Sequence, residues 1–157
     1  MPGKITLVVG LPGSGKSTIS KRLALEEEIT DRHSDDDDFL RPELKPPFGL
    51  EGVIDRLKEG RTCIVNDIAL CEQVKRRETS DRITDAVLGV AIRWYFFDND
   101  VIPCVANVVL DGFRGIRGDT MERIKAIRRL SLLYQPPLDE TQRVFSPFPP
   151  IKKPNRR

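Results

Sequence analysis

The feature that most constrains the fold is a glycine-rich segment that directly follows the apolar run 5–9, Gly10-Leu11-Pro12-Gly13-Ser14-Gly15-Lys16-Ser17. The segment matches G-x-x-x-x-G-K-[ST] at every fixed position. Such a loop wraps consecutive backbone N–H groups around a phosphate, and it needs residues without a Cβ where the chain turns sharply. The apolar run before it and the predicted helix after it favour this interpretation over a glycine-rich hairpin turn.

The residue types in the loop predict its ligand. Lys16 can reach the β and γ phosphates as a point charge, and the Ser17 hydroxyl can ligate Mg²⁺. The N-terminus of the following helix adds the positive end of its dipole. We therefore expect a nucleoside triphosphate, ATP, with Mg²⁺, bound by Gly10, Leu11, Pro12, Gly13, Ser14, Gly15, Lys16, Ser17 and Thr18.

Length and composition set the class of protein. A chain of 157 residues predicts one main domain. The cysteines are odd in number and widely spaced, which indicates reduced thiols rather than a disulfide or zinc framework: Cys63, Cys71 and Cys104. No apolar run approaches the roughly 20 residues that span a bilayer, and no signal-peptide pattern precedes the first strand. We expect no membrane association and a cytoplasmic location.

Charge is distributed unevenly along the chain. The net charge is only +2, so it does not by itself predict a polyanionic partner. Acidic residues concentrate at 35–38, whereas basic residues concentrate at 114–129 and in the tail 152–157. The two basic regions are candidates for contacts with a phosphate backbone.

Apolar and helical patterns alternate along the chain. Strands are predicted at 5–9, 29–34 (weakly), 62–65, 92–97 and 143–145, and helices at 17–28, 50–59, 73–88, 101–110 and 120–134. In the last helix the residues expected to face the core are Met121, Ile124, Ile127, Leu130 and Tyr134. This order predicts an α/β fold of the P-loop NTPase type, with an open, mainly parallel sheet, helices on both faces and a small lid. We divide the chain into a P-loop domain, 1–134, and a proline-rich basic extension, 135–157.

Two acidic positions are candidates for chemistry. A run of aspartates usually forms a solvated loop, but the run 35–38 follows the P-loop and leads to Phe39 and Arg41, which favours an acceptor-binding role. Asp67 ends the apolar run 62–65 at the edge where ligands of parallel sheets gather. It could hold the Mg²⁺ shell, receive the acceptor hydroxyl, or only cap the segment that follows.

A glycine- and arginine-rich segment lies between the last two predicted helices. Three glycines alternate with Arg114 and Arg117 over residues 112–118. Flexible backbone with guanidinium groups is what a closing lid over a transferring phosphoryl group requires. An ordinary exposed turn is the alternative.

Together the P-loop, the acidic run, the Asn66-Asp67 strand end and the segment Asp119-Thr120-Met121-Glu122-Arg123 resemble the 5'-hydroxyl kinase domain of bacteriophage polynucleotide kinase, over most of residues 1–134. The resemblance implies a general-base aspartate, a nearby arginine, an aspartate after the third strand and a lid arginine. These would be Asp37 or Asp38, Arg41, Asp67 and Arg123. The family pattern has two aspartates before the aromatic residue and its arginine directly after, whereas this chain has four and inserts Leu40. Anchoring on Phe39 selects Asp37 and anchoring on Arg41 selects Asp38.

The resemblance implies transfer of the γ-phosphoryl group of ATP to a hydroxyl on nucleic acid. The acceptor would be a polynucleotide 5' end or a hydroxymethylated pyrimidine, because phage kinases of 5-hydroxymethyluracil in DNA share the pattern. No phosphatase domain is expected at this length. A kinase of a free nucleoside or sugar is the alternative, followed by a nucleotide-binding switch that transfers no phosphoryl group. We expect DNA as the partner.

Overall fold

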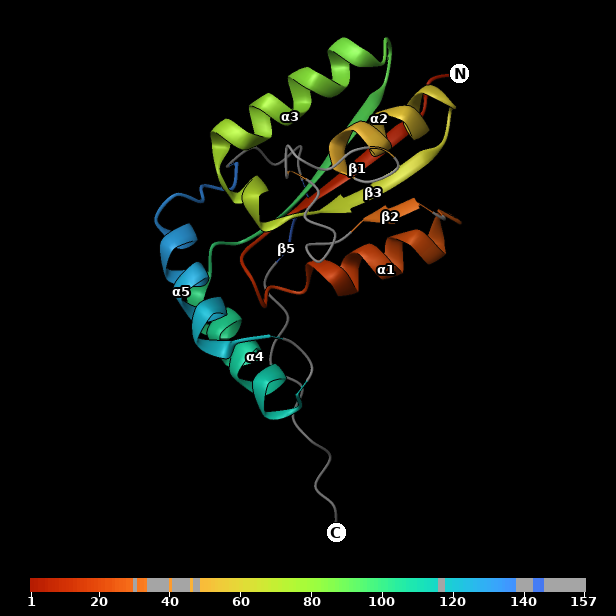
Figure 1. Cartoon of the computed structure of the whole chain (residues 1–157). Helices are drawn as coiled ribbons and strands as arrows, with labels where there is room; N and C mark the ends of the chain where they lie inside the picture. The colour runs from red at the N-terminus through yellow and green to blue at the C-terminus, as the bar shows by residue number, and fades with distance from the viewer. Residues whose placement is uncertain are drawn as a thin grey trace.

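The computed structural model describes residues 1–29, 31–33, 40, 46, 49–115, 118–137 and 143–145. Its centre is a five-stranded sheet in the order β2-β3-β1-β4-β5, and every neighbouring pair of strands is parallel (Figure 1). The strands are β1 (Lys4–Val9), β2 (Asp31–His33), β3 (Thr62–Asn66), β4 (Ala91–Phe97) and β5 (Arg143–Phe145). The predicted α/β class with a parallel sheet is confirmed.

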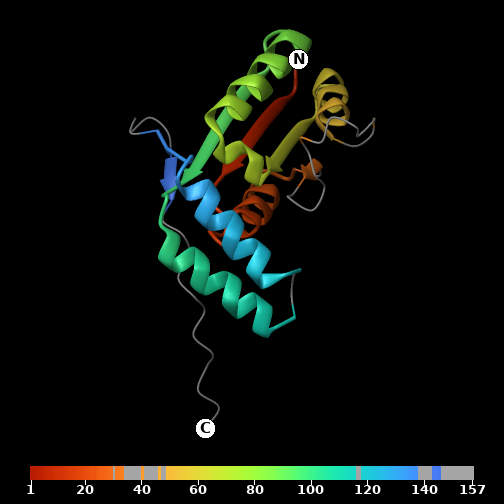
Figure 2. The same ribbon diagram turned by 60° about the vertical axis from the view of Figure 1, so that its left-hand side comes forward.

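Helices cover both faces of the sheet. They are α1 (Lys16–Glu26), α2 (Gly49–Lys58), α3 (Gln73–Ala86), α4 (Val101–Phe113), α5 (Thr120–Ser131) and a short 3₁₀ helix, η2 (Ile68–Cys71). In Figure 1, α2 and α3 lie on one side of the strands and α1 lies on the other. Figure 2 shows α4 and α5 packed side by side as a pair at one end of the sheet. We call this pair the α4–α5 arm.

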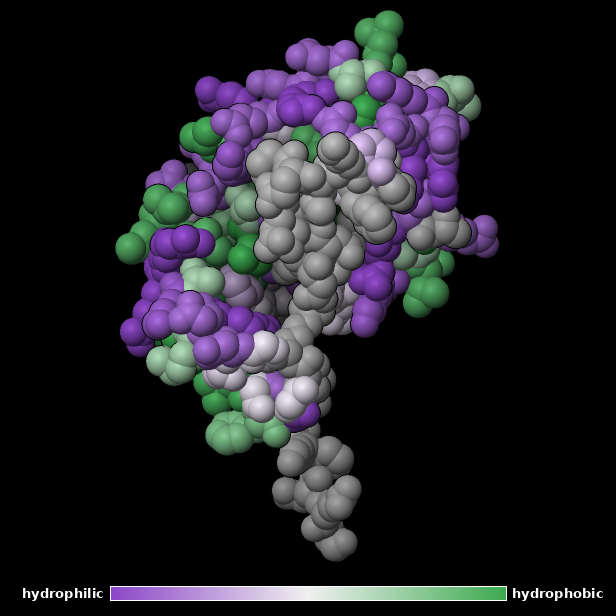
Figure 3. Space-filling model, viewed as in Figure 1, coloured by the Kyte–Doolittle hydropathy of each residue, from purple (hydrophilic) through white to green (hydrophobic). Residues whose placement is uncertain are grey.

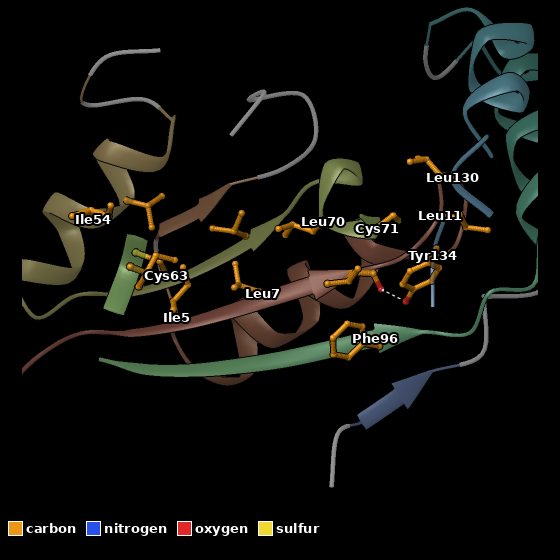
Figure 4. Close-up of a cluster of buried hydrophobic side chains, with 14 of the residues drawn as sticks. Ile5, Leu7, Leu11, Ile54, Cys63, Leu70, Cys71, Phe96, Leu130 and Tyr134 are labelled. Atoms are coloured by element: carbon orange, nitrogen blue, oxygen red, sulfur yellow. Dashed lines mark hydrogen bonds between the residues drawn. The ribbon is translucent and has the colours of Figure 1, made fainter. Parts of the chain in front are cut away.

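The two faces of the sheet bury different side chains. Ile5, Leu7 and Val9 of β1 point into the larger cluster, which also contains residues from α2, α3 and both helices of the arm (Figure 4). Val8 points the other way and packs with Ile19 of α1. Parallel strands that are covered on both faces need apolar residues at successive positions, which explains the unbroken run in β1.

Local signals set most helix boundaries. The Asp119 carboxylate accepts hydrogen bonds from the backbone N–H of Met121, at 2.8 Å, and of Glu122, at 3.3 Å, so it caps α5. Glycine ends α2, because Gly60 has φ +80°. The predicted ends of α1 and α3 were two residues too late, at 28 and 88 rather than 26 and 86.

Met121 is a wrong prediction. Its side chain is 59 % exposed, whereas Ile127, Leu130 and Tyr134 are buried. The 3.6-residue period identifies the apolar stripe of a helix, but it does not say where along the helix the neighbouring core ends. Here the first turn of α5 extends beyond the core.

On the face that Figure 3 shows, the described residues are mainly hydrophilic, with apolar side chains between them. No helix of the described part of the chain is long and apolar enough to cross a membrane. All three cysteines are buried and form no disulfide with one another. Strand β5, inside the expected extension 135–157, joins the sheet beside β4, and Phe97 lies opposite Phe145 in the register. The boundary at residue 134 stays a prediction.

Candidate active site

The P-loop connects β1 to α1 at the centre of the sheet. Gly13 and Gly15 have φ values of +78° and +105°, in the left-handed region that favours glycine. The N–H of Ser14 donates to the carbonyl oxygen of Leu11 at 3.1 Å, which closes the turn. Gly15 is the N-cap of α1, and no side chain caps this helix end. The amides of the first turn of α1 are therefore available to an anion.

Two glycines are also required by packing, which the motif alone does not show. A Cβ at Gly10 would lie 2.6 Å from Ser14 Oγ and 2.9 Å from Cβ of Phe97, a residue of β4. A Cβ at Gly13 would lie 2.4 Å from the carbonyl oxygen of Cys104 in α4. The loop is thus held between β4 and the α4–α5 arm, and its glycines allow the close approach.

Lys16 lies folded over the loop. Its side chain is largely buried, with the residue 4 % exposed, and Nζ donates a hydrogen bond to the carbonyl oxygen of Leu11 at 3.1 Å. It lies near Cys104, whose pKa burial raises to about 11 although the Lys16 charge opposes the shift. That cysteine is therefore a neutral thiol at physiological pH, and it places no negative charge beside the lysine.

The remaining predicted loop residues divide by exposure. Leu11 and Pro12 are buried and Thr18 is exposed, while Ser17 is half-buried. Ser14 Oγ is buried and, in the described structure, has no hydrogen-bond partner. An unpaired buried hydroxyl is costly unless a ligand satisfies it, so the loop fits a polar anionic group such as a polyphosphate.

Asp67 lies at the carboxyl end of β3 and acts as a cap. Its Oδ1 accepts from the N–H of Ala69 at 2.7 Å, at the start of η2, and its Oδ2 accepts from the N–H of Leu40 at 3.3 Å. The capping interpretation is confirmed. A role of Asp67 toward Mg²⁺ or the acceptor stays a prediction.

Asn66, to which sequence reasoning assigned no role of its own, is the last residue of β3 and precedes Asp67. Its side chain is fully buried, and its Oδ1 accepts from Ser20 Oγ of α1 at 3.2 Å. Its Nδ2 has no hydrogen-bond partner in the described structure. The sequence signal that could have identified Asn66 is a polar residue at the last position of an otherwise apolar strand.

The predicted acceptor residues Asp37, Asp38 and Arg41 lie outside the described residues, as do Asp35 and Phe39. Strand β2 ends at His33, which lies opposite Val65 in β3. The chain therefore enters this segment at the same sheet edge that carries Asn66 and Asp67.

The arginines predicted to act from a lid differ in their surroundings. Arg123 on α5 is mostly buried, and its Nη2 donates to Asp111 Oδ2 of α4 at 3.2 Å. Its Nη1 is buried and has no hydrogen-bond partner in the described structure. Arg114 is exposed at the end of α4, and Arg117 lies outside the described residues. Sequence reasoning missed Asp111, because no local motif marks it.

Known structures identify the fold. No family model matches the sequence, and no curated protein sequence matches it significantly. The structure is similar to a fungal RNA kinase, with a TM-score of 0.60, 13 % identity and coverage of 99 % of this chain and 78 % of that one. It is also similar to a gluconokinase from Sinorhizobium meliloti 1021, with a TM-score of 0.57, 17 % identity and coverage of 92 % and 81 %. The chain has the fold of the P-loop kinases.

A third similar structure with the P-loop kinase fold belongs to a Pnkp1/Rnl/Hen1 RNA repair complex. The TM-score is 0.56 at 19 % identity, and the match covers 99 % of this chain but 50 % of that chain. Proteins with this fold thus include kinases of nucleic acid and of a small molecule, by the names of the matched structures. The match supports the α/β P-loop kinase fold and does not single out phage polynucleotide kinase.

Proposed function

We propose that this protein is an ATP-dependent kinase that transfers the γ-phosphoryl group to a hydroxyl. The observation that carries the proposal is the phosphate cradle between β1 and α1, in which an uncapped helix N-terminus, a buried unpaired Ser14 hydroxyl and the buried Lys16 converge. These are donors for a polyphosphate, and the P-loop kinase fold extends over 92 to 99 % of the chain.

The loop would hold the triphosphate of ATP through the amides of residues 13–18. Lys16 would exchange its hydrogen bond with the Leu11 carbonyl for the β and γ phosphates. Ser17, half-buried at the start of α1, would ligate Mg²⁺. When bound, Mg²⁺ neutralises charge on the β and γ oxygens.

The transfer step needs a base and a positive charge. Asp37 or Asp38 would take the proton of the acceptor hydroxyl, whose oxygen forms a bond to the γ phosphorus as the bond to the β–γ bridging oxygen breaks and ADP leaves. Arg123 would donate from Nη1 to the equatorial oxygens, where charge spreads in the transition state. Arg41, Arg114 and Arg117 are further cations for the acceptor or the lid, and Asp67 would orient Mg²⁺ or the acceptor.

The acceptor that we propose is a hydroxyl on nucleic acid, namely a hydroxymethylated pyrimidine in DNA or a 5' end. The matches to an RNA kinase and to a component of an RNA repair complex, each covering 99 % of this chain, support it. Exposed arginines on the arm, Arg114, Arg128 and Arg129, could contact flanking phosphates. The gluconokinase match favours the second candidate, a small-molecule kinase.

One transfer assay separates these acceptors. The enzyme receives ATP labelled in the γ-phosphate, with three classes of acceptor: linear DNA and RNA with 5'-hydroxyl ends, covalently closed DNA containing 5-hydroxymethyluracil, and free nucleosides with gluconate. An end kinase labels only the linear forms, whereas a base-hydroxymethyl kinase labels the closed circle. Labelling of only the free molecules would refute the nucleic-acid acceptor and establish the small-molecule kinase.

Lys16→Ala is the matched test of the phosphate site. Lys16 donates to the Leu11 carbonyl of the loop and lies outside the hydrophobic core, so we expect its loss to abolish transfer while thermal unfolding changes little. Lys21→Ala, at an exposed position of α1, is the control and should retain transfer. Near wild-type transfer by the Lys16 variant would show that the loop is not the phosphate site.

A further inference from the structure

Helix α4 contacts the P-loop directly at Gly13. The side-chain Nδ2 of Asn107 donates to the carbonyl oxygen of Gly13 at 2.9 Å, across 94 positions of sequence. The backbone of Cys104 and the side chain of Val108 lie so close to Gly13 that a Cβ there would come within 2.4 and 3.0 Å of them. The Gly13 turn of the phosphate cradle therefore packs against one face of α4.

The same helix holds the lid arginine. Asp111 lies four residues after Asn107, and residues at this spacing lie on one face of a helix, about 6 Å apart along its axis. Asp111 accepts from Arg123 Nη2 at 3.2 Å, and the Asp111 and Arg123 side chains are only 30 % and 19 % exposed. One helical turn thus separates the anchor of the P-loop from the anchor of the arginine.

The ion pair with Asp111 leaves one terminal nitrogen of the Arg123 guanidinium, Nη1, without a hydrogen-bond partner in the described structure. A bidentate carboxylate contact would occupy both terminal nitrogens of Arg123, but Nη1 is buried with no hydrogen-bond partner in the described structure. A buried unpaired donor of this kind is unfavourable for stability. Stability alone therefore does not explain the arrangement, whereas a donor reserved for a ligand does.

We propose that Asn107 and Asp111 are positioning residues of the phosphoryl-transfer site. Asn107 fixes the Gly13 turn of the P-loop against α4, and Asp111 fixes the Arg123 guanidinium on the same helix face, so that α4 sets the distance between the phosphate cradle and the lid arginine. The expected effect of these residues on the transfer rate rests on the proposed kinase function, whereas their expected effect on nucleotide binding requires only that the P-loop binds nucleotide.

Nucleotide binding tests the Asn107 half. Asn107→Asp is nearly isosteric and places a carboxylate oxygen against the Gly13 carbonyl, whereas Asn107→Ala removes the donor. With a non-hydrolysable ATP analogue and Mg²⁺ in calorimetry, we expect Kd to rise about tenfold or more for Asn107→Asp and about threefold to tenfold for Asn107→Ala. A Kd within twofold of wild type for both variants would overturn this half.

Asn99 provides a matched control for Asn107. Its amide also donates to backbone carbonyls, those of Ser131 at 2.7 Å and Tyr134 at 2.9 Å, but at the other end of the arm. Asn99→Ala should lower the unfolding temperature and leave the Kd of the analogue within twofold. Equal losses of affinity in the Asn99 and Asn107 variants would mean that any weakening of the arm impairs binding, which refutes specific positioning.

Rate tests the Asp111 half. Asp111→Ala should lower kcat about tenfold or more with the KM for ATP within twofold, because a guanidinium acts mainly on charge that develops in the transition state. Asp111→Asn keeps an acceptor oxygen and should recover most of the rate. In a double-mutant cycle, Asp111→Ala should have no further effect on kcat when Arg123 is already alanine. Additive losses, or no loss of kcat, would refute the assignment.

A control and a second reaction complete the test. Glu122→Ala removes an exposed α5 ion pair, with Lys125 at 2.7 Å, and should leave kcat unchanged. Slow hydrolysis of ATP by water needs no added acceptor. The double-mutant cycle of Asp111 and Arg123 can therefore also be measured on the rate of ATP hydrolysis. If wild type transfers to none of the acceptors, the kinase proposal fails, while hydrolysis and analogue binding still support or refute the positioning roles.

Discussion

Replacing Gly13 by alanine tests whether the P-loop is seated on α4 as the structure indicates. Two costs add at this position. The backbone has φ +78°, which costs an alanine about 1–2 kcal/mol. The new Cβ would also lie 2.4 Å from the carbonyl oxygen of Cys104, about 1 Å closer than ordinary contact, and a helix backbone yields only by shifting. Overpacking of this kind costs about 1–3 kcal/mol, so we expect a total loss of about 2–5 kcal/mol.

Gly115 separates the two costs. Its φ is +62°, and a Cβ there would meet nothing within 4 Å, so Gly115→Ala carries the backbone cost without the clash. Urea unfolding can be followed through the single tryptophan, Trp94, which stacks on Phe96 in β4. We expect Gly13→Ala to be less stable than Gly115→Ala by about 1–3 kcal/mol. A difference below about 0.5 kcal/mol would refute the close packing of α4 on the loop.

Three further predictions concern single side chains. Tyr134→Phe should lower the free energy of unfolding in urea by about 1–2 kcal/mol, because the buried hydroxyl donates to the carbonyl oxygens of Val9 and Phe97. Tyr95→Phe, the control, should lower it by less, and equal losses in the two variants would contradict the prediction. Asp67→Asn should lose less stability than Asp67→Ala, because asparagine keeps one acceptor oxygen for the Ala69 N–H, whereas alanine removes the cap and should lose about 1 kcal/mol. Retained transfer in both variants would limit Asp67 to capping. In the acidic run, either Asp37→Asn or Asp38→Asn should reduce the transfer rate about 10²- to 10⁴-fold, whereas Asp35→Asn should not reduce it. Losses below about threefold in all three variants would refute a general base in this run.

Sequence by itself determined the features that depend on neighbouring residues. The P-loop pattern requires residues without a Cβ where the chain turns sharply, and two of its glycines, Gly13 and Gly15, have positive φ values. Unbroken apolar runs indicated buried parallel strands, and the helical spacing of apolar residues indicated a helix that begins at residue 120. Each of these signals is local, because backbone sterics, capping and side-chain periodicity act over a few residues.

Tertiary structure decided which distant residues meet. Asn107 and Gly13 are 94 positions apart, and Asp111 reaches Arg123 only because α4 and α5 pack side by side. No local pattern marks either contact, since each depends on the packing of whole helices. Packing also left Met121 exposed although it lies on the predicted apolar stripe. Short-range physics therefore determined the phosphate loop and the elements around it, whereas the partners of the loop and of the lid arginine depend on the long-range arrangement of α4 and α5.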